Sequence, residues 1–225
     1  MKKIKALRRR GQAGAQGQGL VEFALVLPLL ILLILGIAEM GFALYNYLTL
    51  ATANREGVRL ASRARYDDET VAELVVNSSG LIEQPDGSFR PNMVLEGDDA
   101  NLGVIITHIS VSPEGVLLDI DTFVSGVING ADNVPRPITP ADTMFTTDEL
   151  DELVQNSLDS TSTINAYRQG MLFNTMNNEV IVLETFLSHR LFSPILLPLM
   201  NETITLHFHS VMRVMSDARN PQVGP

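Results

Sequence analysis

Two pairs of side chains have types and spacings that could bind a metal ion or transfer protons. His207 and His209 are two residues apart in a segment typical of a β-strand, so both imidazoles would lie on one face. Asp119 and Asp121 have the same spacing, and paired carboxylates can serve acid–base catalysis or calcium binding. The sequence identifies no third ligand for the histidines, and alternation places the aspartates on the outward face of a strand. We interpret both pairs as ordinary strand residues and expect no metal and no cofactor.

Motifs of known catalytic sites are missing from the sequence. There is no cysteine, no Gly-x-Ser-x-Gly, no phosphate-binding glycine-rich loop and no His-Glu-x-x-His. We therefore expect a structural protein that is not an enzyme and has no small-molecule substrate. An anchored hydrolase remains the alternative, and it would require a pocket that combines a nucleophile, a base and hydrogen-bond donors.

Another ionisable residue, Glu22, lies at the start of a long apolar stretch. Residues 23–38 carry no charge and would form about 24 Å of helix at about 1.5 Å per residue. Extending this helix to Leu20 and Leu44 gives the roughly 20 residues that a bilayer requires, with Glu22 and Glu39 near the two interfaces. A carboxylate inside the bilayer costs free energy. The pattern predicts a membrane-spanning helix whose first acidic residue either contacts water or has a specific partner.

A cleaved secretory signal is the competing interpretation of this stretch. Gly36-Ile37-Ala38 has the small-x-small pattern of a signal-peptidase site. We favour the membrane span because the basic region before it is long and the helical character continues past residue 38. Pro28 is compatible with both interpretations, since membrane helices tolerate proline.

Charge asymmetry predicts the orientation of the span. From Asn46 onward the chain carries 10 basic and 24 acidic residues, within a total net charge of −10. Basic residues next to a span remain in the cytoplasm, so the acidic bulk should lie outside. Acidic surface repels phosphate, which argues against nucleic acid as a partner. Residues 1–21 contain no acidic residue and six basic ones: Lys2, Lys3, Lys5, Arg8, Arg9 and Arg10.

Helical spacing continues beyond the apolar stretch. One face with 3,4-spacing carries Leu44, Leu48, Ala51, Arg55, Val58, Ser62 and Arg65. This predicts a single helix over residues 18–66 that is apolar first and amphipathic later, with Gly57 as its weak point. Arg55, Arg59 and Arg63 form a basic ridge on it. The ridge is either an ordinary solvated surface or a site for an acidic partner.

The N-terminal residues carry a resemblance to a known family. The strings GQGLVEFALVLPLLILLILGIAEMG and ANREGVRLASR are similar to those of the TadE-like pseudopilins of tight-adherence (Tad, or Flp) pilus systems. A looser similarity covers residues 179–215, where two strands flank an apolar loop that contains prolines. Residues 66–178 match no motif.

The resemblance implies processing and assembly rather than catalysis. A membrane prepilin peptidase would cut after Gly17, so that Gln18 becomes the new N-terminus and Glu22 the fifth mature residue. Glu22 and Phe23 would then set the register among other pilins or pseudopilins, with a partner amine neutralising the carboxylate. The protein would reside in the bacterial cytoplasmic membrane with its C-terminal domain outside, and could enter a pilus. A membrane-anchored or secreted binding module unrelated to pili is the alternative.

The sequence predicts three segments. Residues 1–17 form a cytoplasmic basic leader, 18–66 the long helix, and 67–225 an extracytoplasmic α+β head. Within the head, alternating apolar residues predict an antiparallel sheet of about four strands beside helices. Expected strands cover 104–112, 115–124, 179–192 and 202–215; expected helices cover 67–79 and a segment opening at Thr147; a turn is expected at 84–88 and a long loop at 125–147.

Overall fold

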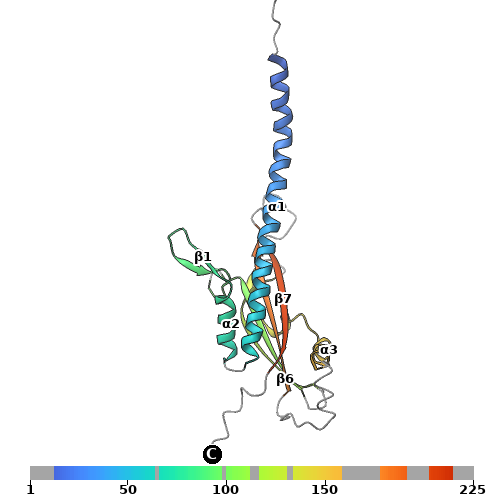
Figure 1. Cartoon of the computed structure of the whole chain (residues 1–225). Coiled ribbons are helices and arrows are strands. Elements are labelled where there is room, and N and C mark those ends of the chain that lie inside the picture. The colour runs from blue at the N-terminus through green and yellow to red at the C-terminus, as the bar shows by residue number, and fades with distance from the viewer. Residues whose placement is uncertain are drawn as a thin grey trace, which may run out of the picture.

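The computed structural model describes residues 13–63, 66–97, 100–111, 117–130, 134–158, 178–191 and 203–214. Its first element is one continuous helix of 49 residues, α1 (Ala13–Ala61), with Pro28 in its interior. The N-terminal half of α1 extends clear of the head, and the C-terminal half packs on it (Figure 1). The predicted architecture, a long apolar helix followed by an α+β head, is confirmed.

A five-stranded antiparallel sheet forms the centre of the head. It contains β3 (Leu102–Val111), β4 (Leu117–Asn129), β5 (Pro135–Pro137), β6 (Asn178–Arg190) and β7 (Thr203–Arg213). The strand order is β5-β4-β3-β6-β7, and each neighbouring pair is antiparallel. Four strands agree with the predicted segments within a few residues, because strands covered on both faces read as apolar runs in the sequence.

The predicted loop over residues 125–147 is wrong in its first half. β4 continues to Asn129, and the short β5 and a 3₁₀ helix, η1 (Pro140–Asp142), follow. Two prolines in β5 conceal a strand at the level of sequence, since proline cannot donate to a ladder. They are tolerated here because β5 is the outermost strand on this side of the sheet. Gly126, with φ of +99°, allows the close approach to Leu102 O that any Cβ would obstruct.

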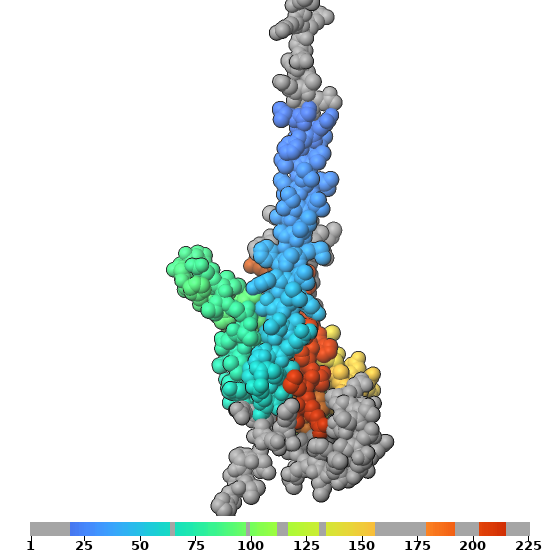
Figure 2. Space-filling view, in the orientation of Figure 1, coloured from blue at the N-terminus to red at the C-terminus, as the bar shows by residue number. Residues whose placement is uncertain are grey.

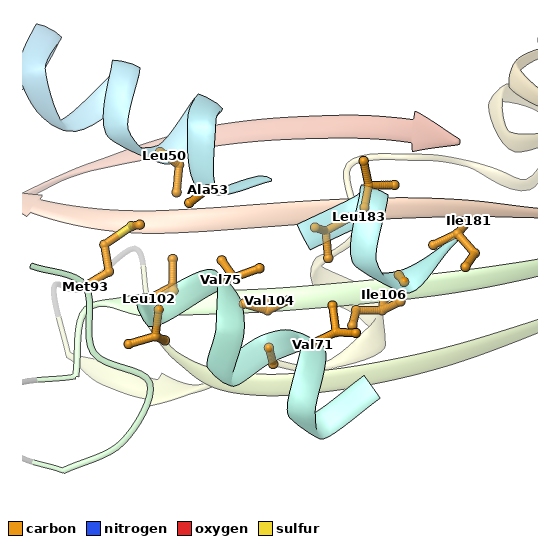
Figure 3. Close-up of a cluster of buried hydrophobic side chains, with 14 of the residues drawn as sticks. Leu50, Ala53, Val71, Val75, Met93, Leu102, Val104, Ile106, Ile181 and Leu183 are labelled. Carbon is orange, nitrogen blue, oxygen red and sulfur yellow. The ribbon is translucent and has the colours of Figure 1, made fainter. Parts of the chain in front are cut away.

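The helices cover both faces of the sheet. The C-terminal half of α1 and α2 (Asp68–Asn77) lie on one face, and α3 (Thr147–Leu158) packs on the other. Figure 3 shows the core of the first face, where Leu50 of α1 and Val75 of α2 meet Val104 of β3 and Leu183 of β6. A second cluster places Leu150 and Val154 of α3 against the opposite face. The sheet is therefore a middle layer that fixes both sets of helices.

Helix boundaries follow local capping. α1 ends at Ala61, before the predicted boundary at residue 66, and a turn at Ser62 and Arg63 follows. Asp67 then caps α2, its side chain accepting from Thr70 N at 2.7 Å. An N-cap residue needs an extended backbone, so α1 cannot continue into α2.

A small hairpin projects from the head beside α1 (Figure 1). It consists of β1 (Leu81–Glu83) and β2 (Phe89–Pro91), which pair around the predicted turn at residues 84–88. The sequence predicted this turn but neither of the two three-residue strands, which are too short to show alternation. Residues 159–177, and the apolar loop predicted at 192–202, lie outside the described residues.

Candidate functional site

The N-terminal half of α1 carries the predicted processing and assembly residues on an exposed apolar rod. Gly17 and Gln18 lie within the helix, just after its start at Ala13. Glu22 and Phe23 are exposed. Figure 2 shows this part of α1 standing away from the head. By length and composition, the segment from Gly19 qualifies as a helix that can cross a membrane.

Burial begins abruptly at Leu50, which is fully enclosed. The buried face of α1 then runs through Ala53, Asn54, Val58 and Ala61. The stripe expected from spacing is partly wrong, because Leu44 and Leu48 remain more than half exposed. The predicted members Ala51, Val58 and Ser62 are buried, and spacing alone missed Asn54 because its side chain is polar.

Asn54 fixes α1 to the sheet. Its side chain is fully buried, and Nδ2 donates to Leu183 O at 2.9 Å and Phe208 O at 3.3 Å. A further contact of 3.1 Å joins Nδ2 to Thr185 Oγ1. One amide thus bonds to both β6 and β7, whereas an apolar residue could slide along them. Because a buried polar group is costly unless it is bonded, these contacts define one register of α1 on the sheet.

Gly57 brings α1 close to α2 and β6. A Cβ atom at this position would lie 2.4 Å from Val75 Cγ2 and 2.6 Å from Leu183 Cδ2. Both distances are well below van der Waals contact, so a side chain would push the layers apart. The glycine that looked like a weakness of the helix is therefore a packing requirement.

The three arginines of the predicted basic ridge have different surroundings. Arg55 lies over the ring of Phe208, with its Cζ atom 5.7 Å from the ring centroid. Arg59 forms an ion pair with Glu56, and this bond is the main cause that lowers the pKa of the Glu56 carboxyl. Arg63 is exposed. The ridge therefore follows the side of α1 that borders β7.

A second polar contact joins α1 to the end of β6, above the buried segment. Asn46 Nδ2 lies 2.8 Å from His189 Nδ1, and His189 Nε2 lies 3.5 Å from Glu39 Oε1. Because an amide nitrogen can only donate, Nδ1 accepts and a neutral ring carries its proton on Nε2, toward Glu39. At 3.5 Å this second contact is electrostatic rather than a hydrogen bond.

His108 joins α2 to the sheet through two carboxylates. Its Nε2 lies 2.9 Å from Asp68 Oδ1, and its Nδ1 lies 2.5 Å from Glu179 Oε1. The bond to Asp68, followed by that to Glu179, raises the pKa of His108 to about 9 despite burial. The imidazolium thus serves as a doubly bonded bridge at neutral pH. Sequence reasoning missed it because its partners are 40 and 71 residues away.

Glu184 is a fully buried carboxylate on the opposite face of the sheet. It accepts from Thr143 Oγ1 at 2.6 Å and Met144 N at 3.0 Å, and His207 Nε2 lies 3.3 Å away. These bonds hold the segment before α3 against the sheet. Sequence reasoning missed Glu184 as well, since it interrupts an apolar strand and no local pattern predicts its donors.

The expectation that His207 and His209 share a face is confirmed. Their rings stack with centroids 5.8 Å apart, and His209 also contacts Phe145 edge to face. Burial, with a smaller effect from His207, lowers the pKa of His209. Among the described residues, no cluster of three or more histidine or acidic side chains is arranged to hold a metal ion. Asp119 and Asp121 are exposed, as predicted.

The fold and the site together define a protein with a protruding apolar helix rigidly joined to an α+β head. The family model of TadE-like proteins matches residues 17–59, which confirms the predicted resemblance over that segment. The match starts at Gly17 and ends at Arg59, so it spans the exposed rod and the docking contacts of Asn54 and Gly57. Comparisons with curated proteins and with solved structures gave no match.

Proposed function

We propose that this protein is a TadE-like minor pseudopilin that contributes to assembly or initiation of a Tad/Flp-type pilus for adhesion or secretion. The main support is that the family-matched segment, residues 17–59, is one unbroken helix. Its first half is apolar and exposed, and its second half packs against the head. This helix can reside in the cytoplasmic membrane and later pack among other pilin helices. Its role is structural, and it catalyses no reaction.

The chemistry of assembly resides at the new N-terminus. A prepilin peptidase cuts after Gly17, on the cytoplasmic side, and leaves a free α-amine on Gln18. Glu22 lies about one turn further along the helix and can pair with an amine of its own or a neighbouring subunit. In low dielectric, an unmatched carboxylate is heavily penalised. The charge therefore favours only the helix register that supplies its partner.

The test is the N-terminal peptide and intact mass of the protein, expressed with and without a cognate prepilin peptidase. We expect a chain that begins at Gln18 only when the peptidase is present. A start near Glu39 would indicate a secreted protein with a conventional signal. An uncut chain, alongside a control pilin that is processed, would indicate a plain anchored module.

A substitution separates processing from assembly. Glu22→Ala should still be cut after Gly17 but should not co-purify with partner pilins. Glu83→Ala, which removes an exposed carboxylate on the projecting hairpin, is the matched control and should behave as the unsubstituted protein. Normal co-purification of the Glu22 variant would refute the register role.

A further inference from the structure

The two long edges of the sheet are open among the described residues. β7 pairs with β6 on one side, and no described strand lies on its other side. In Figure 2, β7 lies at the surface between α1 and α3. At the opposite edge, β5 covers Val127–Asn129 of β4 and Ile138 N donates to Gly126 O, so residues 117–125 pair with β3 alone. Exposed edges present backbone donors and acceptors that can accept another strand.

The two edges carry opposite charge on the same face of the sheet. Beside β7, the basic ridge of Arg55, Arg59 and Arg63 follows α1, and Arg55 covers Phe208 of β7. Asp119 and Asp121 lie opposite Ser110 and His108 in the β3–β4 register, so they are on the face that α2 covers. The acidic edge consists of Asp119 and Asp121 of β4; α2, which contacts β4, adds the exposed Glu69 and Glu73, whereas its Asp68 is paired with His108.

A common helix direction fixes how two copies can meet. The contacts of Asn46 with His189 and of Asn54 with Leu183 show that α1 runs antiparallel to β6, and therefore parallel to β7. β4 is antiparallel to β3, and β3 is antiparallel to β6, so β4 runs in the same direction as β6. Because β6 is antiparallel to β7, β4 runs opposite to β7. If two copies have parallel α1 helices, β7 of one meets β4 of the next in antiparallel orientation. Antiparallel pairing needs no reversal of either head.

We propose that a second copy of this chain binds at these edges, with β7 and the basic ridge of one head against β4 and the acidic edge of the next. The contact is heterologous, since different surfaces meet, and it leaves a free edge at each end. The arginines and the aspartates then face each other on one side of the joined sheet. Pairing opposite edges also avoids the repulsion that two acidic edges would experience.

This inference rests on the proposed function, because a shared membrane is what makes the α1 helices parallel. Packing of apolar helices alone would leave the heads free to rotate. Contacts between heads would give the assembly a fixed step from one subunit to the next.

Cysteine cross-linking in membranes tests the contact, since the native chain contains no cysteine. Met212→Cys labels the β7 edge and Asp119→Cys labels the β4 edge; both side chains are exposed. With a short bismaleimide, each single variant should stay monomeric, a mixture of the two should give dimers, and the double variant should give a ladder. Ser88→Cys, at the tip of the projecting hairpin, controls for random collision.

The outcomes distinguish this contact from the proposed function. Cross-linking of either single variant with itself would indicate an isologous contact and overturn the proposal. Absence of a ladder in a sample whose chains all begin at Gln18 would overturn the head contact while leaving the pseudopilin function standing. In the double-cysteine background, Arg55→Glu with Arg63→Glu should abolish the ladder. Adding Glu69→Lys and Asp121→Lys should restore it, with unchanged thermal unfolding confirming that the head is folded.

Discussion

At the scale of residues, buried polar groups determine how the layers are held. Asn54 bonds α1 to two strands, His108 bonds α2 to the sheet, and Glu184 bonds the segment before α3. Each of these polar contacts fixes a direction that an apolar core could not, because apolar contacts are non-directional. None of these partners is local: the bonds join residues 40 to 154 positions apart.

This distance explains what the sequence could and could not predict at the site. Gly17, Gln18, Glu22 and Phe23 form one continuous motif, so a single stretch was sufficient to select them. Asn54 and Glu184 have no local signal beyond being polar residues in apolar segments. Their identification requires knowing which strands they face, which is a property of the tertiary fold.

The double bridge of His108 predicts a pH dependence of stability. Its pKa is raised in the folded state to about 9 from an ordinary 6.5, so its contribution is complete below pH 6.5 and is lost as pH rises through 9. Hydrogen bonds to charged groups contribute about 2 kcal/mol. We expect His108→Ala to lower the free energy of unfolding by about this amount at pH 6 and by little at pH 10.

Thermal unfolding of the full-length protein in detergent between pH 6 and 10 measures this difference. The groups that face His108 are Asp68, Glu179 and the cross-strand Asp121. His209→Ala is the control: its pKa is lowered, so its titration should affect stability at lower pH. If the difference in stability between wild type and His108→Ala is the same at pH 6 and at pH 10, the bridge is not the titrating contact.

At the scale of elements, helix α1 has two halves with different requirements. The exposed half needs only apolar length, which is why hydropathy predicted it well. The docked half must fit against α2, β6 and β7, and its buried face includes Asn54 and Gly57, so apolar spacing predicted that face poorly. The long strands of the sheet were predictable because their apolar runs are bounded by turn residues. β5 was not predictable, since proline hides it.

A substitution at Gly57 separates helix propensity from packing. Alanine would favour the helix by about 1 kcal/mol, yet its Cβ would overlap Val75 and Leu183, and overpacking costs about 1–3 kcal/mol. We expect Gly57→Ala to lower stability by about 1 kcal/mol, measured by chemical denaturation in detergent. Gly41→Ala is the matched control, because nothing lies within 4 Å of that Cβ. Equal effects of the two variants would contradict the packing role.

At the scale of the whole molecule, the unbroken helix couples the rotation of the head to that of the span. Each residue turns the helix by about 100°, so inserting two alanines between Leu35 and Gly36 rotates the head by about 200°, and four by about 40° net. Suppose that assembly requires one fixed angle about the helix axis between Glu22 and the head edges. In that case, inserting two alanines should abolish co-purification with partner pilins. Four alanines should retain more of it, although they displace the head further.

Processing provides the control for these insertions, since both variants should be cut after Gly17. Stability should also be unchanged, because Gly36 lies in the exposed half of α1, outside the core. A monotonic loss with insertion length would show that distance, rather than phase, limits assembly.

The parallel course of α1 and β7 has a mechanical consequence. Extraction from the bilayer, or tension on a fibre, would pull on α1 along its own axis. That axis lies along the strands, so the load would slide α1 past β6 and β7 and strain the bonds of Asn54 and Asn46 together. Contacts loaded simultaneously in shear resist more force than contacts peeled one after another. The head is therefore joined to its helix in a geometry that loads these bonds in shear.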